Sequence, residues 1–434
     1  MTRLVLRGAR WPGDVAVEDG RIVAVGSVPE EPGDEVVRVD GDLITAGLVN
    51  THHHFYQWMT RGRAVGCDLF GWLTELYPVW ARLSAEDVHA AALVALAELA
   101  LTGCTTAADH HYVVPGGDDS VFDAIAAAAG TVGIRVHLAR GSMDLGESKG
   151  GLPPDFLVEE LDAILASTES VAARLQDGER VVVTVAPCSP FSVTPELMIE
   201  SAALARRHGL RLHTHLAETL DEERSCLERF GKRPLQLLDD LGWIANDVWI
   251  AHGIHFDDAE VARLGETSTG IAHCPSSNSR LGSGIARVVD LTAAGAPVGL
   301  GVDGVASNEI GTLFPEMRMA LFLARQRDLS ATTFAPVDAL ALATEGGARC
   351  LGRDDVGRLE PSFRADVVVW PGEDLADVLD PIAGLVLGPE RTARHVFVDG
   401  EPVVSDGHLV SADIADLRAN LARRVRRLWP ENAA

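Results

Sequence analysis

The chain has 434 residues, of which 47% are hydrophobic and 23% are charged, an ordinary globular composition. This length suits a large barrel with a smaller appended unit better than one small domain. The 37 basic and 63 acidic residues give a net charge of −26, which excludes nucleic acids and anionic membranes as expected partners, because both would repel the chain.

Short alternating runs punctuated by Gly and Pro open the chain and return near its end. They read RLVLRGA, DVAVEDG, RIVAVGS and EVVRVDG at the start, and ADVVVWPG and HVFVDGEPVVSDG later. Such runs are typical of β-strands. We therefore expect residues 1–47 and 353–434 to build one small β-sandwich domain from both chain ends, and the amphipathic stretch 413–428 to form a closing helix.

Several features favour a cytoplasmic location. The six cysteines are scattered without a C-x-x-C pair, which fits a reducing compartment. The first residues, MTRLVLRGAR, lack the apolar segment of a signal peptide. The longest apolar-rich segment, residues 90–103, carries Glu98 and is too short to cross a bilayer, so we expect a buried helix there.

Apolar strand-like runs alternate with Ala- and Leu-rich helical patterns through the middle of the chain. The eight candidate strands read LVNTHH, CTTAADH, IRVHLAR, VVVTVAP, LRLHTHL, VWIAHG, TGIAHC and PVGLGVD. Eight β/α units predict an α/β fold, a (β/α)₈ barrel of the TIM type, over residues 48–352. Its functional site is expected at the carboxyl ends of the strands.

The first of these strands ends in three consecutive histidines. Successive side chains of a strand point to opposite faces, so His52 and His54 share one face while His53 points the other way. His-x-His is a metal-ligand spacing, although two histidines on a strand can equally be packing or surface residues. Whether this pair binds a metal depends on ligands from the other strands.

Polar residues also end the later strands. The fifth carries His213 and His215 and is followed by Glu218, the sixth ends in His252, the seventh in His273 and the eighth in Asp303. In a (β/α)₈ barrel these positions converge on one mouth although they lie far apart in sequence.

A catalytic zinc site takes three or more His or carboxylate ligands and leaves a position for water. His52, His54, His215 and Asp303 make a plausible set, with His213 one layer deeper and His273 structural. Zinc, iron and manganese share such ligands.

Glu218 is placed to relay protons beside a metal-bound water, or it is an ordinary carboxylate at a helix start. His252 could hold that water or help deprotonate it.

The combination of H-x-H, HTHxxE, a histidine on strand six and GVDG on strand eight resembles the amidohydrolase superfamily, in its mononuclear aminohydrolase branch. The resemblance runs along essentially the whole chain. It implies His52, His54, His215 and Asp303 as ligands of one divalent ion, zinc first and Fe²⁺ second, with Glu218, His252 and Asp303 as catalytic groups. Strand four, VVVTVAPCSP, lacks the lysine that bridges two metals in binuclear members, so one metal is expected.

The resemblance also indicates a reaction, the hydrolytic deamination of an amino-substituted N-heterocycle. The stretches THHHFYQWMTRG, GWLTELYPVWARL and APCSPFSVT look most like those of branch members that convert 8-oxoguanine to urate and ammonia. Removal of amino or alkylamino groups from hydroxylated s-triazines is an alternative, as is deamination of guanine, isocytosine or a pterin. A catalytically inactive scaffold is a further alternative, which the complete ligand set argues against. We expect a homo-oligomer, because this is the default for such folds.

Five residues are candidates for contact with a flat heterocyclic substrate, and each has a structural alternative. Gln57 could pair with a ring amide edge, and Tyr77 or Trp80 could stack on the ring, or both aromatics could pack a helix onto the barrel. Arg140 could meet a carbonyl oxygen or pair with an acidic neighbour. Asn308 could touch the substrate or shape its loop.

Overall fold

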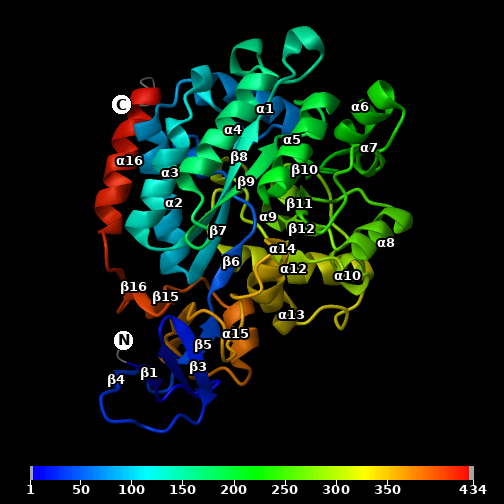
Figure 1. The fold of residues 1–434 in the computed structure, drawn as a ribbon. Helices are drawn as coiled ribbons and strands as arrows, with labels where there is room; N and C mark the ends of the chain where they lie inside the picture. Colours follow the sequence, from blue (N-terminus) through cyan, green and yellow to red (C-terminus); the bar gives the residue numbers. More distant parts are fainter. Residues whose placement is uncertain (1–2, 430–434) are drawn as a thin grey trace.

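Eight parallel strands form one sheet in a computed structural model of the protein, which describes residues 3–429 (Figure 1). Each strand pairs with the next one along the chain, and the two outer strands meet where the backbone N–H of Thr51 donates to the Leu300 carbonyl (2.8 Å). The predicted barrel with eight strands is thereby confirmed. The strands are β6 (Leu48–Asn50), β7 (Cys104–His111), β8 (Arg135–Ser142), β9 (Val181–Pro187), β10 (Arg211–Leu216), β11 (Val248–His252), β12 (Gly270–His273) and β13 (Val298–Leu300).

Helices surround the barrel and fill the links between its strands (Figure 1). The α-helices are α1 (Leu69–Trp80), α2 (Ala85–Leu101), α3 (Ser120–Val132), α4 (Leu161–Leu175), α5 (Pro195–His208), α6 (Leu220–Phe230), α7 (Pro234–Asp240), α8 (Asp258–Thr267), α9 (Pro275–Arg280), α10 (Val288–Ala293), α11 (Val305–Asn308), α12 (Leu313–Asp328), α13 (Pro336–Ala341), α14 (Gly347–Cys350), α15 (Pro381–Leu387) and α16 (Ile414–Leu428). Short 3₁₀ turns are η1 (Phe55–Met59), η2 (Pro115–Gly117), η3 (Glu147–Lys149), η4 (Asp155–Leu157) and η6 (Gly372–Leu375), and η5 (Leu342–Gly346) is a π-helical turn.

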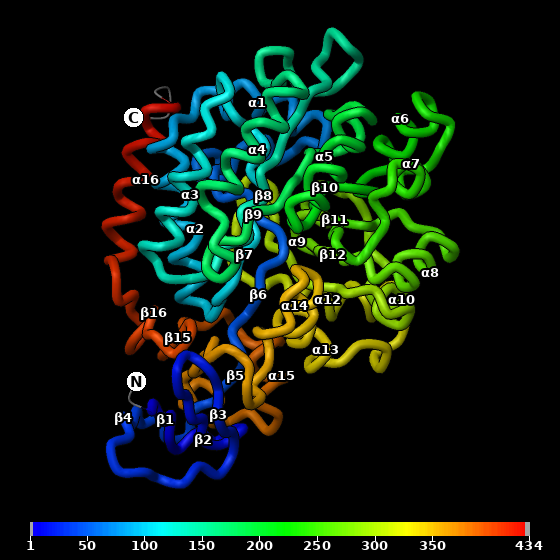
Figure 2. The backbone as a smooth tube through the Cα atoms, in the orientation of Figure 1, coloured from blue at the N-terminus to red at the C-terminus, as the bar shows by residue number. Residues whose placement is uncertain are grey.

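The two chain ends meet in a second, smaller unit below the barrel, where blue and orange segments lie together in Figure 2. One sheet has the order β3–β2–β1–β4, and the other, β17–β16–β15–β14–β5, joins a strand from the start of the chain to strands from its end. A shared core of residues such as Leu6, Ile22, Val367 and Phe397 packs the sheets together, which confirms the predicted sandwich. The strands are β1 (Leu4–Arg7), β2 (Asp14–Glu18), β3 (Arg21–Gly26), β4 (Glu35–Arg38), β5 (Leu43–Ala46), β14 (Val367–Trp370), β15 (His395–Val398), β16 (Glu401–Ser405) and β17 (His408–Leu409).

Helix α16 closes the chain against α2 on one side of the barrel (Figure 2). Helix α2 begins with a capping box in which Ser84 and Asp87 exchange hydrogen bonds between side chain and backbone. The buried Asp87 carboxylate also accepts hydrogen bonds from Arg424 (2.9 Å) and Arg427 of α16. Asp87 therefore caps α2 and also anchors α16 to it. The apolar run at 90–103 lies almost entirely in α2 and is buried, as expected.

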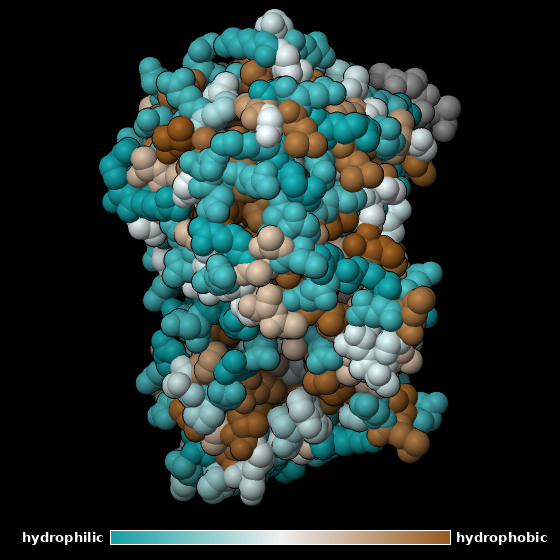
Figure 3. Space-filling view, turned by 90° about the vertical axis from the view of Figure 1, so that its right-hand side faces the viewer, coloured by the Kyte–Doolittle hydropathy of each residue, from teal (hydrophilic) through white to brown (hydrophobic). Residues whose placement is uncertain are grey.

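Hydrophilic side chains cover most of the face in Figure 3, with smaller hydrophobic patches between them. Within residues 3–429, no helix has both the length and the apolar character that a membrane crossing requires. All six cysteines are free thiols, and five of them are buried.

Three buried histidines of the barrel are expected to contribute less to stability in mild acid. Burial lowers the pKa of His111, His137 and His273 to about 3, well below the ordinary value near 6.5. The unfolded chain takes up protons at these groups below about pH 6.5 while the folded chain does not, so their contribution is complete above that pH and is lost as the pH falls toward 3. When the pH falls from about 7.5 to about 5.5, the contribution of each of these histidines to the unfolding free energy should decrease by roughly 1 kcal/mol.

Urea unfolding at the two pH values, with EDTA present, measures this loss. A His137→Asn chain should lose roughly 1 kcal/mol less than wild type over the same interval. The matched control is His208→Asn, since His208 is exposed and should leave the loss unchanged. A His137→Asn chain that changes in unfolding free energy by the same amount as wild type between the two pH values would contradict the prediction.

Candidate metal centre and active site

Side chains from four barrel strands converge at the carboxyl end of the sheet. His52 and His54 lie just beyond β6, His215 is in β10, His252 ends β11, and Asp303 follows β13. All five are buried. The two-residue spacing of a strand places His52 and His54 on the same face, as the sequence predicts.

The polar atoms of this cluster lie within a few ångströms of one another. Asp303 Oδ1 is 3.2 Å from His54 Nε2 and 3.5 Å from His52 Nε2. His54 Nε2 and His215 Nε2 are 3.3 Å apart. The ligand atoms of His52, His54 and His215 all lie within 4.8 Å of one another, and so do those of His52, His252 and Asp303.

The tautomers of the three imidazoles show whether this cluster fits a cation. The Nδ1–H groups of His54 and His215 donate to the backbone carbonyls of His110 and Cys188, so their Nε2 atoms carry lone pairs. Within residues 3–429, His52 Nε2 has no hydrogen-bond partner. Three lone pairs and a carboxylate oxygen facing one another would repel without a positive charge between them. The donor set therefore fits one divalent cation.

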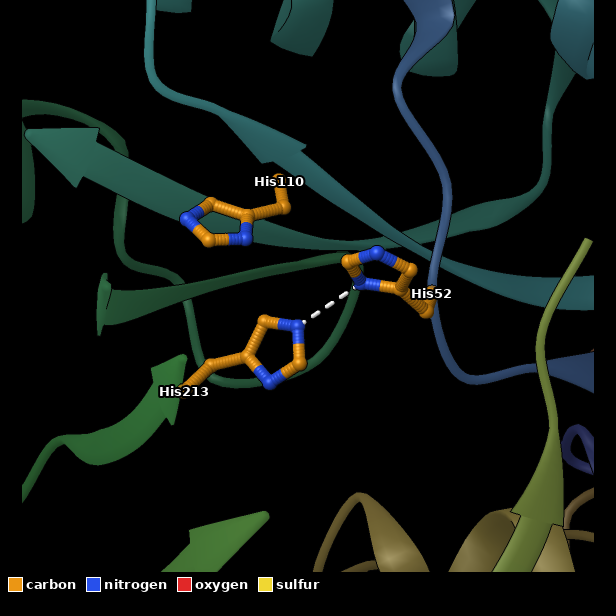
Figure 4. A group of neighbouring side chains, drawn as sticks. All are labelled: His52, His110 and His213. Atoms are coloured by element: carbon orange, nitrogen blue, oxygen red, sulfur yellow. Dashed lines mark hydrogen bonds between the residues drawn. The ribbon is translucent and has the colours of Figure 1, made fainter. Parts of the chain in front are cut away.

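His213 lies one layer deeper in the barrel and orients the imidazole of His52, the third of these ligands (Figure 4). Its Nδ1–H donates to the Trp249 carbonyl (2.9 Å), so its Nε2 accepts the Nδ1–H of His52 (2.8 Å). The dashed line in Figure 4 marks this second bond, and His110 lies beside the pair without bonding to either. His110 instead donates from Nε2 to the Ala186 carbonyl (2.9 Å). His213 thus leaves His52 Nε2 free, which is the supporting role expected from the sequence.

Three donors orient the Asp303 carboxylate. Its Oδ2 accepts the hydroxyls of Ser277 (2.6 Å) and Ser307 (3.2 Å), and its Oδ1 accepts the backbone N–H of Gly304 (2.8 Å). Asp303 itself has φ 62°, a left-handed conformation that is unusual for a residue with a side chain. Such strain is typical of functional sites, where the surrounding structure enforces it.

Glu218 and His252 lie next to each other at the edge of the cluster. Glu218 Oε2 is 3.6 Å from His252 Nε2, and His252 Nδ1–H donates to Asn278 Oδ1 (2.9 Å). Burial, followed by the negative charge of Asp303, raises the pKa of Glu218 well above the ordinary carboxyl range. A carboxyl group that keeps its proton near neutral pH can act as a general acid.

A small pocket opens onto these groups. Its polar side is formed by His54, His215, Glu218, His252 and Asp303. Its other walls are mostly apolar or aromatic and consist of Leu69, Trp72, Leu73, Tyr77, Tyr112, Cys188, Phe191 and Leu281. Flat walls opposite a polar end suit a planar ring with one reactive edge.

Two of the five candidate substrate contacts lie at or near this pocket. Tyr77 lines it, and its hydroxyl has no hydrogen-bond partner among residues 3–429. Gln57 is buried in η1 against Gly304, the residue after Asp303, and a Cβ at Gly304 would overlap its side-chain oxygen. In the described part of the chain, the Gln57 amide makes no hydrogen bond of normal length.

The other three candidates are engaged elsewhere. The indole N–H of Trp80 donates to Thr60 Oγ1 (3.0 Å). Arg140 binds the Glu159 carboxylate with both terminal nitrogens (3.0 and 2.7 Å), and Asn308 donates to the Val302 carbonyl (2.7 Å). None of the three lines the pocket. Their positions agree with the packing, ion-pairing and loop-shaping alternatives that the sequence leaves open.

Sequence reasoning did not single out Tyr112, Trp72, Ser277 or Asn278 as site residues. Tyr112 could have been found, because it directly follows the strand that ends in His110 and His111. The other three are brought to the site by helices α1 and α9, and no local pattern distinguishes them from ordinary helix residues.

Residues 43–403 match the Amidohydrolase family, and the chain therefore belongs to this family, as the sequence resemblance predicts. It is 51% identical over 417 residues to an 8-oxoguanine deaminase from Pseudomonas aeruginosa, covering 94% of this chain and 93% of that protein. It is 39% identical to a hydroxydechloroatrazine ethylaminohydrolase from Pseudomonas sp. (strain ADP), over 81% and 77% of the two chains. Among solved structures, an atrazine chlorohydrolase from Arthrobacter aurescens TC1 complexed with zinc superimposes with a TM-score of 0.92 at 30% identity, covering 97% of this chain and all of the other.

Proposed function

We propose that the protein is a metal-dependent aminohydrolase that converts 8-oxoguanine and water to urate and ammonia. The observation that carries the proposal is the meeting of three free imidazole lone pairs and the Asp303 carboxylate beside Glu218 in one pocket. The choice of substrate is supported by the 51% identity to an 8-oxoguanine deaminase over nearly the whole chain.

His52, His54, His215 and Asp303 would hold one divalent ion. Zinc is the first choice, supported by the zinc in the similar atrazine chlorohydrolase, and Fe²⁺ suits the same ligands. When bound, such an ion lowers the pKa of a coordinated water to about 7 and so supplies a nucleophile at neutral pH.

Glu218 would carry the protons of the reaction. Its raised pKa lets it donate a proton to the ring nitrogen beside the carbon that bears the amino group. A C–O bond forms at that carbon while the attacking water gives one proton to His252 or Asp303 and its second proton to Glu218. The C–N bond breaks as Glu218 passes this proton to the leaving ammonia and the carbonyl forms, and the proton held by His252 or Asp303 then returns to Glu218.

His252 and Asp303 would be the first acceptors of a proton from the attacking water. The Nδ1–H of His252 is held by Asn278, so its Nε2 can accept or share that proton near Glu218. The aromatic walls contributed by Trp72, Tyr77 and Phe191 would hold the planar ring in place and exclude bulk water.

A parallel assay of ammonia release tests the proposal. The substrates are 8-oxoguanine, guanine, isocytosine and an N-alkylated hydroxytriazine, for which release of the alkylamine is measured. We expect kcat/KM for 8-oxoguanine to exceed the others by about tenfold or more, which corresponds to roughly 1.4 kcal/mol of transition-state binding. Equal or higher values for guanine or isocytosine would refute the substrate assignment while leaving the reaction class in place.

Hydrolysis of a hydroxylated s-triazine is the second candidate, favoured by the 39% identity to the ethylaminohydrolase. A higher kcat/KM for the triazine in the same assay would establish it instead. The homo-oligomer expected from the fold remains a prediction, and size-exclusion chromatography with light scattering would measure it.

A further inference from the structure

A second carboxylate, that of Glu222, holds the turn that carries Glu218. Glu222 Oε1 accepts the backbone N–H of Ala217 (2.9 Å), and Glu222 Oε2 accepts the backbone N–H of Glu218 (2.9 Å). The Glu222 side chain is almost completely buried. Both of its oxygens are thus committed to the two peptide groups that lead into Glu218.

This arrangement differs from an ordinary helix cap. Thr219 is the N-cap of α6, and its side chain accepts the backbone N–H of Glu222 (3.2 Å). In a capping box, a Glu at this position would accept the backbone N–H of the N-cap residue itself. Here the carboxylate reaches past Thr219 to the two preceding residues. Glu222 therefore orders the turn before the helix.

The turn needs such support because of its conformation. Ala217 has φ 53°, a left-handed value that a residue with a Cβ rarely adopts. Its carbonyl accepts the backbone N–H groups of Ile254 and His255, which come from the loop after β11. The turn is thereby fixed on both sides, and the Glu218 carboxyl is left next to His252.

We propose that Glu222 is a positioning residue for catalysis: its two carboxylate oxygens clamp the Ala217–Glu218 backbone and so set where the Glu218 carboxyl lies. This inference rests on the proposed role of Glu218. Glu222 itself does not line the pocket, so it acts through Glu218 and not on the substrate.

The test is Glu222→Gln, which is nearly isosteric but replaces one accepting oxygen with an NH₂ that faces a backbone N–H. We expect kcat to fall by about 10- to 100-fold, because small misplacements of a catalytic group cost rates of this order. KM should stay within about threefold and the metal content should be unchanged, since the metal ligands and pocket walls are intact. The matched control is Glu223→Gln on the same helix, whose carboxylate pairs with Arg233 (2.7 Å) and should leave kcat unchanged.

A double variant separates positioning from a general effect on the fold. If Glu222 acts through Glu218, then Glu218→Gln with Glu222→Gln should show the same residual rate as Glu218→Gln alone, measured at high enzyme concentration. An independent further loss would overturn the inference. So would a single Glu222→Gln variant with kcat within about twofold of wild type, or one that loses metal or fails to fold, because these results assign Glu222 no role or a structural one. Failure of the proposed function is a different result: the wild-type protein would then release no ammonia from any of the heterocycles.

Discussion

Glu218→Gln is expected to lower kcat by at least about 10³-fold while the protein keeps its metal. The Gln side chain matches Glu in size but can neither donate a carboxyl proton to the ring nitrogen nor accept one from water. Burial raises the pKa of the Glu218 carboxyl well above its ordinary range, which favours the protonated form that this substitution removes. Steady-state kinetics with 8-oxoguanine, together with metal analysis of the same preparation, measure both quantities.

The matched control is Glu228→Gln, an exposed glutamate farther along α6 that should leave the rate unchanged. A Glu218→Gln variant that stays within a few-fold of wild type would show that another group transfers the protons. A variant that is inactive because it has lost its metal would instead place Glu218 among the ligands.

Asp303→Ala or His215→Ala should abolish both metal binding and turnover. Each substitution removes one of the four converging donor atoms and leaves an incomplete site. We expect well under one equivalent of bound metal and a loss in kcat of at least about 10³-fold, because several kcal/mol of transition-state stabilisation depend on the ion. Metal analysis after gel filtration, followed by assay with and without added Zn²⁺, gives both values.

His273→Asn is the matched control for this prediction. His273 is buried on the neighbouring strand β12 but belongs to none of the candidate ligand groups within residues 3–429. Its variant should retain the metal. Wild-type protein stripped by a chelator should regain activity with Zn²⁺, whereas the ligand variants should not. Retention of a full equivalent of metal by Asp303→Ala would remove this residue from the ligand set.

The sequence predicts the barrel well because its signals are local. Each strand is a short apolar run bounded by turns, and the period of two places His52 and His54, or His213 and His215, on one face without knowledge of the rest of the chain. The same rule places Asp303 at a strand end. The convergence of these side chains on one site then follows from the topology alone, since the carboxyl ends of parallel strands lie at the same edge of the sheet.

The contacts between distant segments are less predictable. Arg140 lies near the carboxyl end of β8 and could have reached a ligand, but Glu159 from a later loop binds it, and no sequence pattern at either residue predicts this pair. The hydrogen bond from Ser277 to Asp303 likewise depends on how α9 packs over the barrel. Glu222 has the sequence signature of a capping box, yet its side chain accepts the backbone N–H groups of the two residues before the N-cap, because the buried turn at Ala217 leaves these donors without a backbone partner.

The seam of the barrel coincides with the candidate metal centre. The first and last strands meet where the backbone N–H of Asp303 donates to the His52 carbonyl (3.0 Å), and the side chains of these two residues face each other at the same place. An ion held there would link the first strand of the barrel, β6, to its last strand, β13. During synthesis its coordination could be completed only after the eighth strand has emerged and docked. Since such a cation favours the closed state, it would raise the melting temperature by an amount that grows with the logarithm of its concentration divided by its Kd.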